Sequence, residues 1–306
     1  MLCLGIDTSN YTTSAAVFDS EVSSLVQKRK LLSVKEGELG LRQSDAVFQH
    51  TVNLPDIIKS VLPADGRRID RVAVSFSPRD EEGSYMPCFM TGKGAAEMIA
   101  ASVGADIRFF SHQAGHIAAA LFSADALELI EKEFIAFHVS GGTTEAVKVS
   151  PDKDRVFSVR LLAGSLDLKA GQAIDRTGRM LGLAFPAGPE LDALSLKSER
   201  TYKIRPFIRN GSCSLSGLQN KCEKMKADGE PSCDIAKYCI DYISQVIYEM
   251  TAEILSAYPG LPVVYSGGVM SNTLIRKRLF DEFGAVFAAP GFSSDNAAGL
   301  AVLASM

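Results

Sequence analysis

Two of the four histidines of this chain lie four residues apart, in the stretch SHQAGHIAAA. Ser111 is a typical N-cap residue, so we predict that a helix begins at His112. Residues four apart share one face of a helix, and His112 and His116 could therefore bind the same metal ion. The positive helix end also favours neutral imidazole, which is the form that binds metal. The spacing leaves a second interpretation open, in which both rings are partly buried and bond to backbone groups.

The residue after the first histidine distinguishes this motif from that of the zinc proteases. Those proteases carry HExxH, where the glutamate acts as general base. Here the position holds Gln113, whose carboxamide cannot take up the proton, so peptide hydrolysis by that route is disfavoured. A third metal ligand should be a carboxylate or an imidazole, and the best candidate is Asp295 in SSDNAAG. Asp295 could equally be a helix N-cap, and sequence spacing does not decide between the two roles.

Three glycine-containing turns follow apolar segments, at residues 139–145 (VSGGTTE), 185–192 (FPAGPELD) and 265–272 (YSGGVMSN). Glycine lets backbone N–H groups approach a ligand, and such groups at a helix start favour phosphate. One such turn is weak support, because tight turns need glycine anyway. Two SGG turns after buried strands predict a nucleotide-phosphate site. Neither a Walker A motif nor the GxGxxG fingerprint of dinucleotide-binding proteins occurs.

Two further segments could contact a nucleotide or RNA, but each has an ordinary structural interpretation. Polar side chains populate one predicted helix in SLDLKAGQAIDRTGRMLG, namely Asp167, Lys169, Gln172, Asp175 and Arg176. Asp175 could bond a ribose hydroxyl or a nucleobase, or the whole set could form a solvated helix face. Residues 200–209 mix basic and aromatic side chains, which suits an RNA backbone and base stacking. That composition is equally typical of an exposed loop.

The elements that would position these residues show a repeated pattern. Residues 1–6 are an apolar run, followed by a polar turn and a second strand at 15–19; the same sequence of elements recurs at 134–139 and 146–150. Such runs suit buried strands. We interpret the recurrence as an internal duplication, in which each half opens with a hairpin.

Strands and helices alternate through the rest of the chain, which favours α/β layers over an antiparallel sandwich. In the first half we predict helices at 43–62 and 92–104 and strands at 71–77 and 105–111. In the second half we predict a helix-rich stretch at 166–196, a polar loop at 197–214, a long helix at 234–257, and a strand, glycine turn and helix within 261–283. We expect two domains packed around a cleft. They are residues 1–125 completed by a C-terminal helix at 296–306, and residues 126–295 with a helical insertion around 166–240.

Composition restricts the class of protein. The chain has 306 residues, of which 46% are apolar and 22% charged, with a formal charge of −4. That charge disfavours a nucleic-acid coat or a polybasic membrane anchor, although it leaves room for a local basic patch. The six cysteines form no CxxC pair and are typical of reduced thiols. The start lacks a basic n-region, and no apolar run reaches the roughly 18 residues that span a bilayer. We therefore expect a cytoplasmic protein without a membrane partner.

With these motifs in order, the sequence resembles the tRNA N6-adenosine threonylcarbamoyltransferases, once labelled O-sialoglycoprotein endopeptidases. The resemblance spans nearly the whole chain. It rests on seven ordered landmarks: GIDTS, HQAGH, VSGG, AGQAIDRTGRMLGLAFPAGPELD, SLSGL, SGGVMSN and SSDNAA.

The resemblance implies the α/β fold of actin, sugar kinases and chaperone ATPases, with two duplicated RNase H-like lobes around a nucleotide cleft. It implies one divalent metal ion on His112, His116 and Asp295. Iron(II) or zinc suits such ligands, and phosphate oxygens would also admit magnesium or manganese. It further implies an adenine nucleotide (ATP, AMP or an acyl-adenylate) held by His138, Val139, Ser140, Gly141, Gly142, Asp175, Gly188, Asp192 and Asn272. No catalytic residue is identified.

The implied reaction moves a threonylcarbamoyl group from threonylcarbamoyl-adenylate to N6 of adenosine 37 in tRNA, which makes the protein an acyltransferase. The implied partners are tRNA and the other proteins of a threonylcarbamoylation complex, with a dimer as a further option.

Three turns depart from the family pattern. Tyr11 and Thr12 replace an acidic pair, residues 77–87 (SPRDEEGSYMP) replace a glycine-rich loop, and Thr143 replaces a histidine. We expect all three turns to face the cleft. They raise an alternative in which the chain is a diverged paralogue. Such a protein would bind nucleotide and metal as a partner or scaffold subunit, or would transfer the acyl group to another acceptor.

Overall fold

The computed structural model describes residues 1–9, 11–34, 41–294 and 297–306, and these residues form two compact units. The first unit consists of Met1–Glu131, Pro151–Val159 and Gly291–Met306. The second consists of Lys132–Ser150 and Arg160–Pro290. Asp295 and Asn296 lie outside the described residues.

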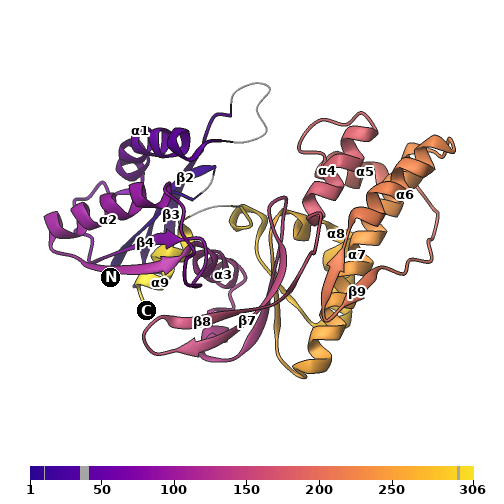
Figure 1. The fold of residues 1–306 in the computed structure, drawn as a ribbon. Helices are drawn as coiled ribbons and strands as arrows, with labels where there is room; N and C mark the ends of the chain where they lie inside the picture. The colour runs from indigo at the N-terminus through magenta and orange to yellow at the C-terminus, as the bar shows by residue number, and fades with distance from the viewer. Residues whose placement is uncertain (10, 35–40, 295–296) are drawn as a thin grey trace. The chain divides into compact units, whose positions relative to one another are not determined.

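The first unit is built on a mixed sheet (Figure 1). Its strands follow the order β3 (Ser24–Leu31), β2 (Thr12–Asp19), β1 (Leu2–Asp7), β4 (Arg71–Ser77) and β5 (Asp106–Ser111). β1, β2 and β3 pair antiparallel, whereas β1, β4 and β5 run parallel. β1 and β2 are buried along their whole length, which explains why LCLGID is nearly uniformly apolar.

Helices cover both faces of this sheet. One face packs against α1 (Gln43–Val61) and α2 (Phe89–Val103), and the other against α9 (Ala298–Ala304), which in turn contacts α3 (His112–Ser123). Leu4 on the first face is fully buried, and burial of such a side chain stabilises the fold by about 2 kcal/mol.

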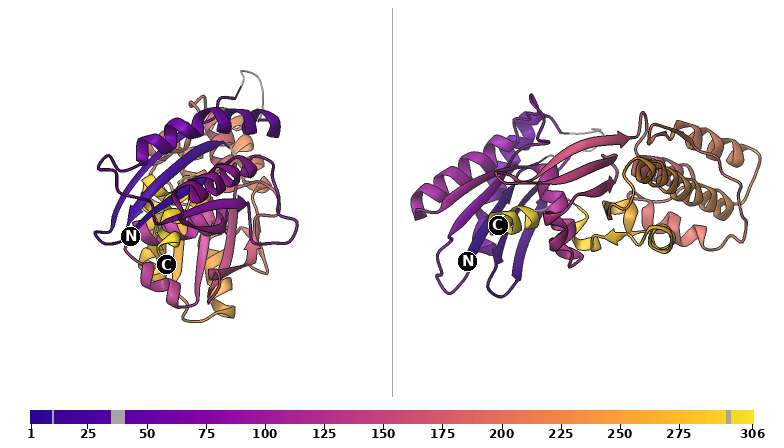
Figure 2. Two further views of the ribbon diagram at one scale, coloured as in Figure 1. Left: turned by 90° about the vertical axis from the view of Figure 1, so that its left-hand side faces the viewer. Right: turned by 90° about the horizontal axis from the view of Figure 1, so that it is seen from below.

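α9 approaches β1 and α3 very closely, and glycines make this possible. A Cβ at Gly5 would clash with the backbone of Ala297 and Ala301, and a Cβ at Gly299 would clash with the backbone of Gly115. The last helix therefore lies beside the first strand, and the two ends of the chain lie close together (Figure 2).

The second unit repeats the strand arrangement of the first. Its sheet has the order β8 (Val156–Gly164), β7 (Thr144–Asp152), β6 (Phe134–Val139), β11 (Val263–Ser266) and β12 (Val286–Phe287). β6 pairs antiparallel with β7, and β6, β11 and β12 run parallel. Both sheets thus place a hairpin beside two parallel strands, and the predicted internal duplication is confirmed.

A helical layer packs on one face of the second sheet and forms the largest core. It contains α4 (Ala170–Met180), α5 (Gly188–Ser195), α6 (Ser216–Ala227), α7 (Ser232–Ala257) and α8 (Thr273–Phe283). The alternate β6 residues Ile135, Phe137 and Val139 point into this layer, as the two-residue period of a strand requires. Figure 1 shows the long α7 running along this side of the unit.

Two local predictions are corrected by the structure. Asp167 was expected on the helix that carries Asp175, but α4 begins only at Ala170. The loop predicted at 197–214 contains a short hairpin of β9 (Phe207–Arg209) and β10 (Ser212–Ser214). No helix in the described part of the chain is long and apolar enough to cross a membrane.

Candidate functional site

The buried carboxylate of Asp7 ends β1 and organises the start of the histidine helix. Its side chain is fully buried and accepts hydrogen bonds from the hydroxyls of Ser9 (2.7 Å) and Ser75. The Nδ1 atom of His112 lies 3.3 Å from the same carboxylate. A carboxylate only accepts hydrogen bonds, so Nδ1 carries the proton in this contact.

This contact gives His112 the electronic form of a metal ligand. In neutral imidazole, a proton on Nδ1 leaves the lone pair on Nε2. Metal-binding histidines usually donate their other N–H to a carboxylate or carbonyl, as His112 does to Asp7. Motif reading missed Asp7 because its partners Ser75 and His112 lie 68 and 105 residues away.

The helix that carries both histidines begins as predicted. Ser111 caps α3, and its hydroxyl oxygen accepts a hydrogen bond from the Ala114 N–H at 3.1 Å. The rings of His112 and His116 lie on the same helix face with centroids 4.4 Å apart and planes at 77°. The structure therefore brings together the two imidazoles that the spacing predicted.

The predicted third ligand cannot be compared with this pair, because Asp295 lies outside the described residues. Among the described residues, no group of three or more His, Cys, Asp or Glu side chains has the arrangement of a metal site. The pair of imidazoles and the oriented Nδ1 of His112 fit a divalent ion that takes its remaining ligand from elsewhere.

In the second unit, the first SGG turn is braced by its own side chains and by α4. The Ser140 N–H donates to the Thr143 carbonyl at 2.7 Å, and the Thr143 N–H donates to the Ser140 hydroxyl at 3.2 Å. A Cβ at Gly171 would lie 2.6 Å from the Gly141 nitrogen, so only glycine lets α4 start this close to the turn. Gly141 and Gly142 are exposed, so their backbone groups can be reached by a ligand.

The residue before this turn, His138, contacts the serine of the second SGG turn. The hydroxyl of Ser266, at the end of β11, donates to the Phe137 carbonyl and lies 3.1 Å from His138 Nδ1. Gly267 then turns with a φ of 97°, and a side chain there would clash with the Val139 backbone. Both turns lie at the carboxyl ends of parallel strands, where open α/β sheets bind ligands.

The other residues that were predicted to bind the nucleotide form two further contacts in this unit. Asp175 accepts a hydrogen bond from the Ala187 N–H at 2.9 Å, which positions the turn that contains Gly188. The Asn272 amide donates to the Asp192 carboxylate at 2.7 Å, and its oxygen caps α8 by accepting from the Ile275 N–H at 3.0 Å. The side chain of Val139 is buried in the core.

Asp167, which the sequence had placed on α4, instead fastens the start of α6. Its carboxylate accepts hydrogen bonds from Leu215 N–H at 2.7 Å, Ser216 N–H at 3.2 Å and the Ser214 hydroxyl at 2.5 Å. Partial burial raises the pKa of this carboxyl, but the hydrogen bonds outweigh it and hold the pKa well below its usual range. The SLSGL landmark is therefore tied to the segment before α4.

Each unit thus collects one kind of chemistry. The first presents two imidazoles on one helix face, one of them fixed by a buried carboxylate. The second presents glycine turns with accessible backbone N–H groups, together with paired polar side chains at Asp192 and Asn272. The first set suits a divalent metal, and the second suits phosphate and ribose groups.

Comparison with solved structures shows the fold. HypF, in its phosphate- and nucleotide-bound form, superposes with a TM-score of 0.60 at 12% identity, over 99% of this chain and 45% of that one. A ROK-family glucokinase from Streptomyces griseus gives 0.55 at 11% identity, over 100% and 99% of the two chains. The predicted α/β fold, which the chain shares with a sugar kinase, is confirmed.

Sequence comparison gives the family. A relative from Aromatoleum aromaticum, named tRNA N6-adenosine threonylcarbamoyltransferase, is 30% identical over 91% of this chain and 82% of its own length. A relative of the same name from Persephonella marina is 30% identical over 91% and 80%. The profile of the tRNA N6-adenosine threonylcarbamoyltransferase family matches residues 24–302. The chain therefore belongs to the tRNA N6-adenosine threonylcarbamoyltransferase family, a family of transferases.

Proposed function

We propose that this protein transfers a threonylcarbamoyl group from threonylcarbamoyl-adenylate to N6 of adenosine 37 in tRNA. The observation that carries the proposal is the Asp7–His112 contact beside His116 in a member of this family. A buried carboxylate that orients one imidazole of a pair has a ready purpose in metal binding.

In this proposal His112, His116 and Asp295 hold one divalent ion, with iron(II) or zinc favoured and magnesium possible. When bound, the ion would supply Lewis acidity toward the oxygens of the acyl phosphate. Asp7 orients His112 so that Nε2 faces away from the carboxylate. Ser9 and Ser75 stabilise the charged form of Asp7, which keeps it an acceptor.

The nucleotide part of the substrate would use the second unit. The backbone N–H groups of Gly141 and Gly142 suit phosphate oxygens, because they belong to an exposed turn that α4, Ser140 and Thr143 brace. Asp192 and Asn272 hold each other and could share hydrogen bonds with ribose hydroxyls. Asp175 supports the Gly188 turn and thus acts through the backbone.

The chemical step forms one bond and breaks one. The N6 amine of adenosine attacks the carbamoyl carbon, a C–N bond forms, the C–O bond to the phosphate breaks, and AMP leaves. The amine loses one proton, which balances the charge. The residues described above would bind and orient the two substrates, so catalysis rests mostly on positioning and charge stabilisation.

The tRNA would be the macromolecular substrate, and we place the reaction in the cytoplasm with the other proteins of a threonylcarbamoylation complex. The segment at 200–209 supports RNA contact, because Phe207 is 53% exposed beside Arg209. An exposed aromatic ring next to a guanidinium suits an unpaired base and its phosphate.

The departures at Tyr11, Thr143 and residues 77–87 support a second candidate. In this version the chain binds nucleotide and metal but serves as a scaffold subunit, or passes the acyl group to another acceptor. Tyr11 is 44% exposed and is available to a different partner.

The experiment deletes the gene in its host and quantifies threonylcarbamoyladenosine in total tRNA. The first candidate predicts loss of the nucleoside and its return with the wild-type gene but not with His112→Ala. A gene for Asp56→Asn, an exposed position on α1, should restore it fully. Unchanged modification without a second gene copy would overturn the transfer proposal. Nucleotide and metal binding by the purified protein would then favour the scaffold.

A further inference from the structure

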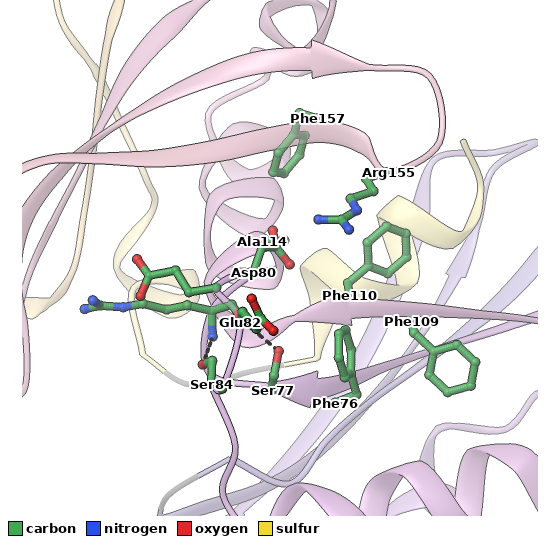
Figure 3. Close-up of a pocket in the computed structure, with 13 residues that line it drawn as sticks. Phe76, Ser77, Asp80, Glu82, Ser84, Phe109, Phe110, Ala114, Arg155 and Phe157 are labelled. Atoms are coloured by element: carbon green, nitrogen blue, oxygen red, sulfur yellow. Dashed lines mark hydrogen bonds between the residues drawn. The ribbon is translucent and has the colours of Figure 1, made fainter.

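The first unit contains a cavity of about 550 Å³ that none of the residues discussed above explains. It is lined by residues of the segment 76–84, the end of β5, the start of α3 and the β7–β8 hairpin (Figure 3). The volume is in the range of small-molecule sites, which are concave, mostly apolar and furnished with a few polar groups.

Phenylalanine rings form the apolar part of the wall. Phe110 and Phe157 are buried, with exposures of 5% and 1%. Phe76 and Phe109 are partly exposed and meet edge to face, with ring centroids 6.3 Å apart and planes at 88°. The interior can therefore take up an apolar body of aromatic size.

The loop that closes the cavity is held in place by hydrogen bonds. The hydroxyl of Ser77 donates to the Arg79 carbonyl at 2.9 Å, and the Arg79 N–H donates to the Ser84 hydroxyl at 3.0 Å (Figure 3). The Gln113 N–H of α3 donates to the Pro78 carbonyl at 3.1 Å. A wall braced in this way needs little reorganisation when a ligand binds.

One carboxyl group faces the interior. Burial raises the pKa of Asp80, and a hydrogen bond from Ser111 and the charge of Arg155 offset this only in part. The charged carboxylate is therefore incompletely compensated in this place, and an ammonium group beside it would complete the compensation. Glu81 and Glu82 add two exposed carboxylates to the lining.

A guanidinium also lines the cavity, and its positive charge acts on the Asp80 carboxyl. Arg155 comes from the connection between β7 and β8, and Figure 3 shows its head group on the opposite side of the cavity from Glu82, with Phe157 and Phe110 beside it. Guanidinium groups bind carboxylates through paired hydrogen bonds. The lining thus combines carboxyl groups and a guanidinium with aromatic rings.

From this arrangement we propose that the cavity is a binding site for a small zwitterion, an apolar α-amino acid, with its ammonium at Asp80 and its carboxylate at Arg155. A simple cation would be repelled by Arg155, and a simple anion by Asp80, Glu81 and Glu82. A molecule with both charges and an apolar side chain complements every part of the wall.

The site is distinct from the metal face of α3 yet linked to the same helix. Ala114 lines the cavity, and successive residues turn by 100° around a helix, so it faces away from His112 and His116. The Ser111 hydroxyl both caps α3 and donates to Asp80. A ligand at Asp80 therefore contacts the network that begins the histidine helix, and the proposal does not depend on the reaction proposed above.

The test is calorimetric titration of the full chain with three probes that share one phenyl group. L-Phenylalanine carries both charges, phenethylamine only the ammonium, and 3-phenylpropionate only the carboxylate. L-Phenylalanine should bind at least about tenfold more tightly than either analogue, because each analogue lacks one charge contact.

Two variants with side chains of similar size test which charged group of the probe each residue contacts. Asp80→Asn should weaken L-phenylalanine and phenethylamine by about tenfold but not 3-phenylpropionate, and Arg155→Gln should weaken L-phenylalanine and 3-phenylpropionate but not phenethylamine. Asp56→Asn and Lys59→Gln, exposed positions on α1, are the matched controls. Unchanged thermal unfolding establishes that each variant is folded.

Three results would overturn the proposal. They are no heat of binding with any probe, phenethylamine binding as tightly as L-phenylalanine, and L-phenylalanine binding that neither Asp80→Asn nor Arg155→Gln weakens. The second result would indicate a site for organic cations instead.

Discussion

The turn after β1 and the turn after β6 occupy equivalent positions in two sheets of the same strand order. They differ in the chemical groups that they present. The first follows Asp7, whose carboxylate is fully buried and fastens hydroxyls and an imidazole. The second follows His138 and Val139 and exposes the backbone of Gly141 and Gly142. One turn presents a buried anion, and the other presents accessible N–H groups.

In the proposed function, this difference separates metal binding at the first turn from phosphate binding at the second. A charge that orients a metal-binding imidazole gains from burial, because the low dielectric strengthens its hydrogen bonds. A phosphate site gains from small residues and exposed amides, because the ligand brings the charge. We therefore expect the first turn to lose its function when side chains are replaced. The second turn should lose its function when its backbone is crowded.

The largest effect is expected at Asp7. Replacing it by alanine leaves the Ser9 and Ser75 hydroxyls and His112 without their shared acceptor, so the free energy of unfolding should fall by about 4 kcal/mol. Urea unfolding measures the change, and Asp106→Ala, exposed on β5, is the control. A loss below about 1 kcal/mol would mean that Asp7 does not organise this unit.

The proposed metal ligands should give the next effect. His112→Ala should lower the affinity for iron(II) or zinc by at least about 100-fold, and Asp7→Asn by about 10- to 100-fold, because the second change only releases the imidazole from its orientation. Equilibrium dialysis with metal analysis makes the comparison. His138→Asn should bind metal normally; if it loses metal as fully as His112→Ala, the division of chemistry between the two turns is wrong.

A smaller effect should follow from crowding the backbone of the second turn. A Cβ at Gly171 would lie 2.6 Å from the Gly141 nitrogen, whereas one at Gly94 in α2 meets nothing within 4 Å. Gly171→Ala should therefore cost about 2 kcal/mol and weaken AMP binding. Gly94→Ala should stabilise the protein by about 0.5–1 kcal/mol. Fluorescence titration and thermal unfolding report both, and equal AMP affinity in the two variants would contradict a role for this turn.

The smallest effect is expected at Asp167, which is exposed but caps α6 from a distance. Asp167→Asn should cost about 1 kcal/mol at pH 7. The pKa of this carboxyl in the folded protein lies below its ordinary value of 3.8, so its stabilisation is present above that pH and is lost as the pH falls toward the folded-state pKa. Unfolding at pH 7 and near pH 3 should show the difference between variant and wild type shrinking, and a constant difference would exclude an ionic cap.

Local patterns predicted the elements well and the long-range contacts poorly. The two hairpins and the start of α3 follow from runs of apolar residues and one capping serine. The Asp7 network could not be predicted, since its members are brought together only when β1, β4 and α3 pack. Asp167 was placed on α4 because its flanking sequence is helical in composition, and its bonds to Ser214 and Leu215, about 48 residues on, override that preference.

The cavity beside α3 could not be predicted from the sequence either, because it also depends on long-range packing. The substituted loop at 77–87 was visible in the sequence, but its partners Phe110 and Arg155 come from separate parts of the chain. Only their assembly places a carboxyl, a guanidinium and aromatic rings around one space.

The close packing of α9 against β1 and α3 has a consequence for how the protein is made. Gly5 and Gly115 lie under a helix that follows the whole second unit in the chain. The first unit therefore cannot complete its core until the second unit has been translated. We expect the second unit to fold first and the N-terminal sheet to wait for its last helix, which makes that unit the one most exposed to chaperones.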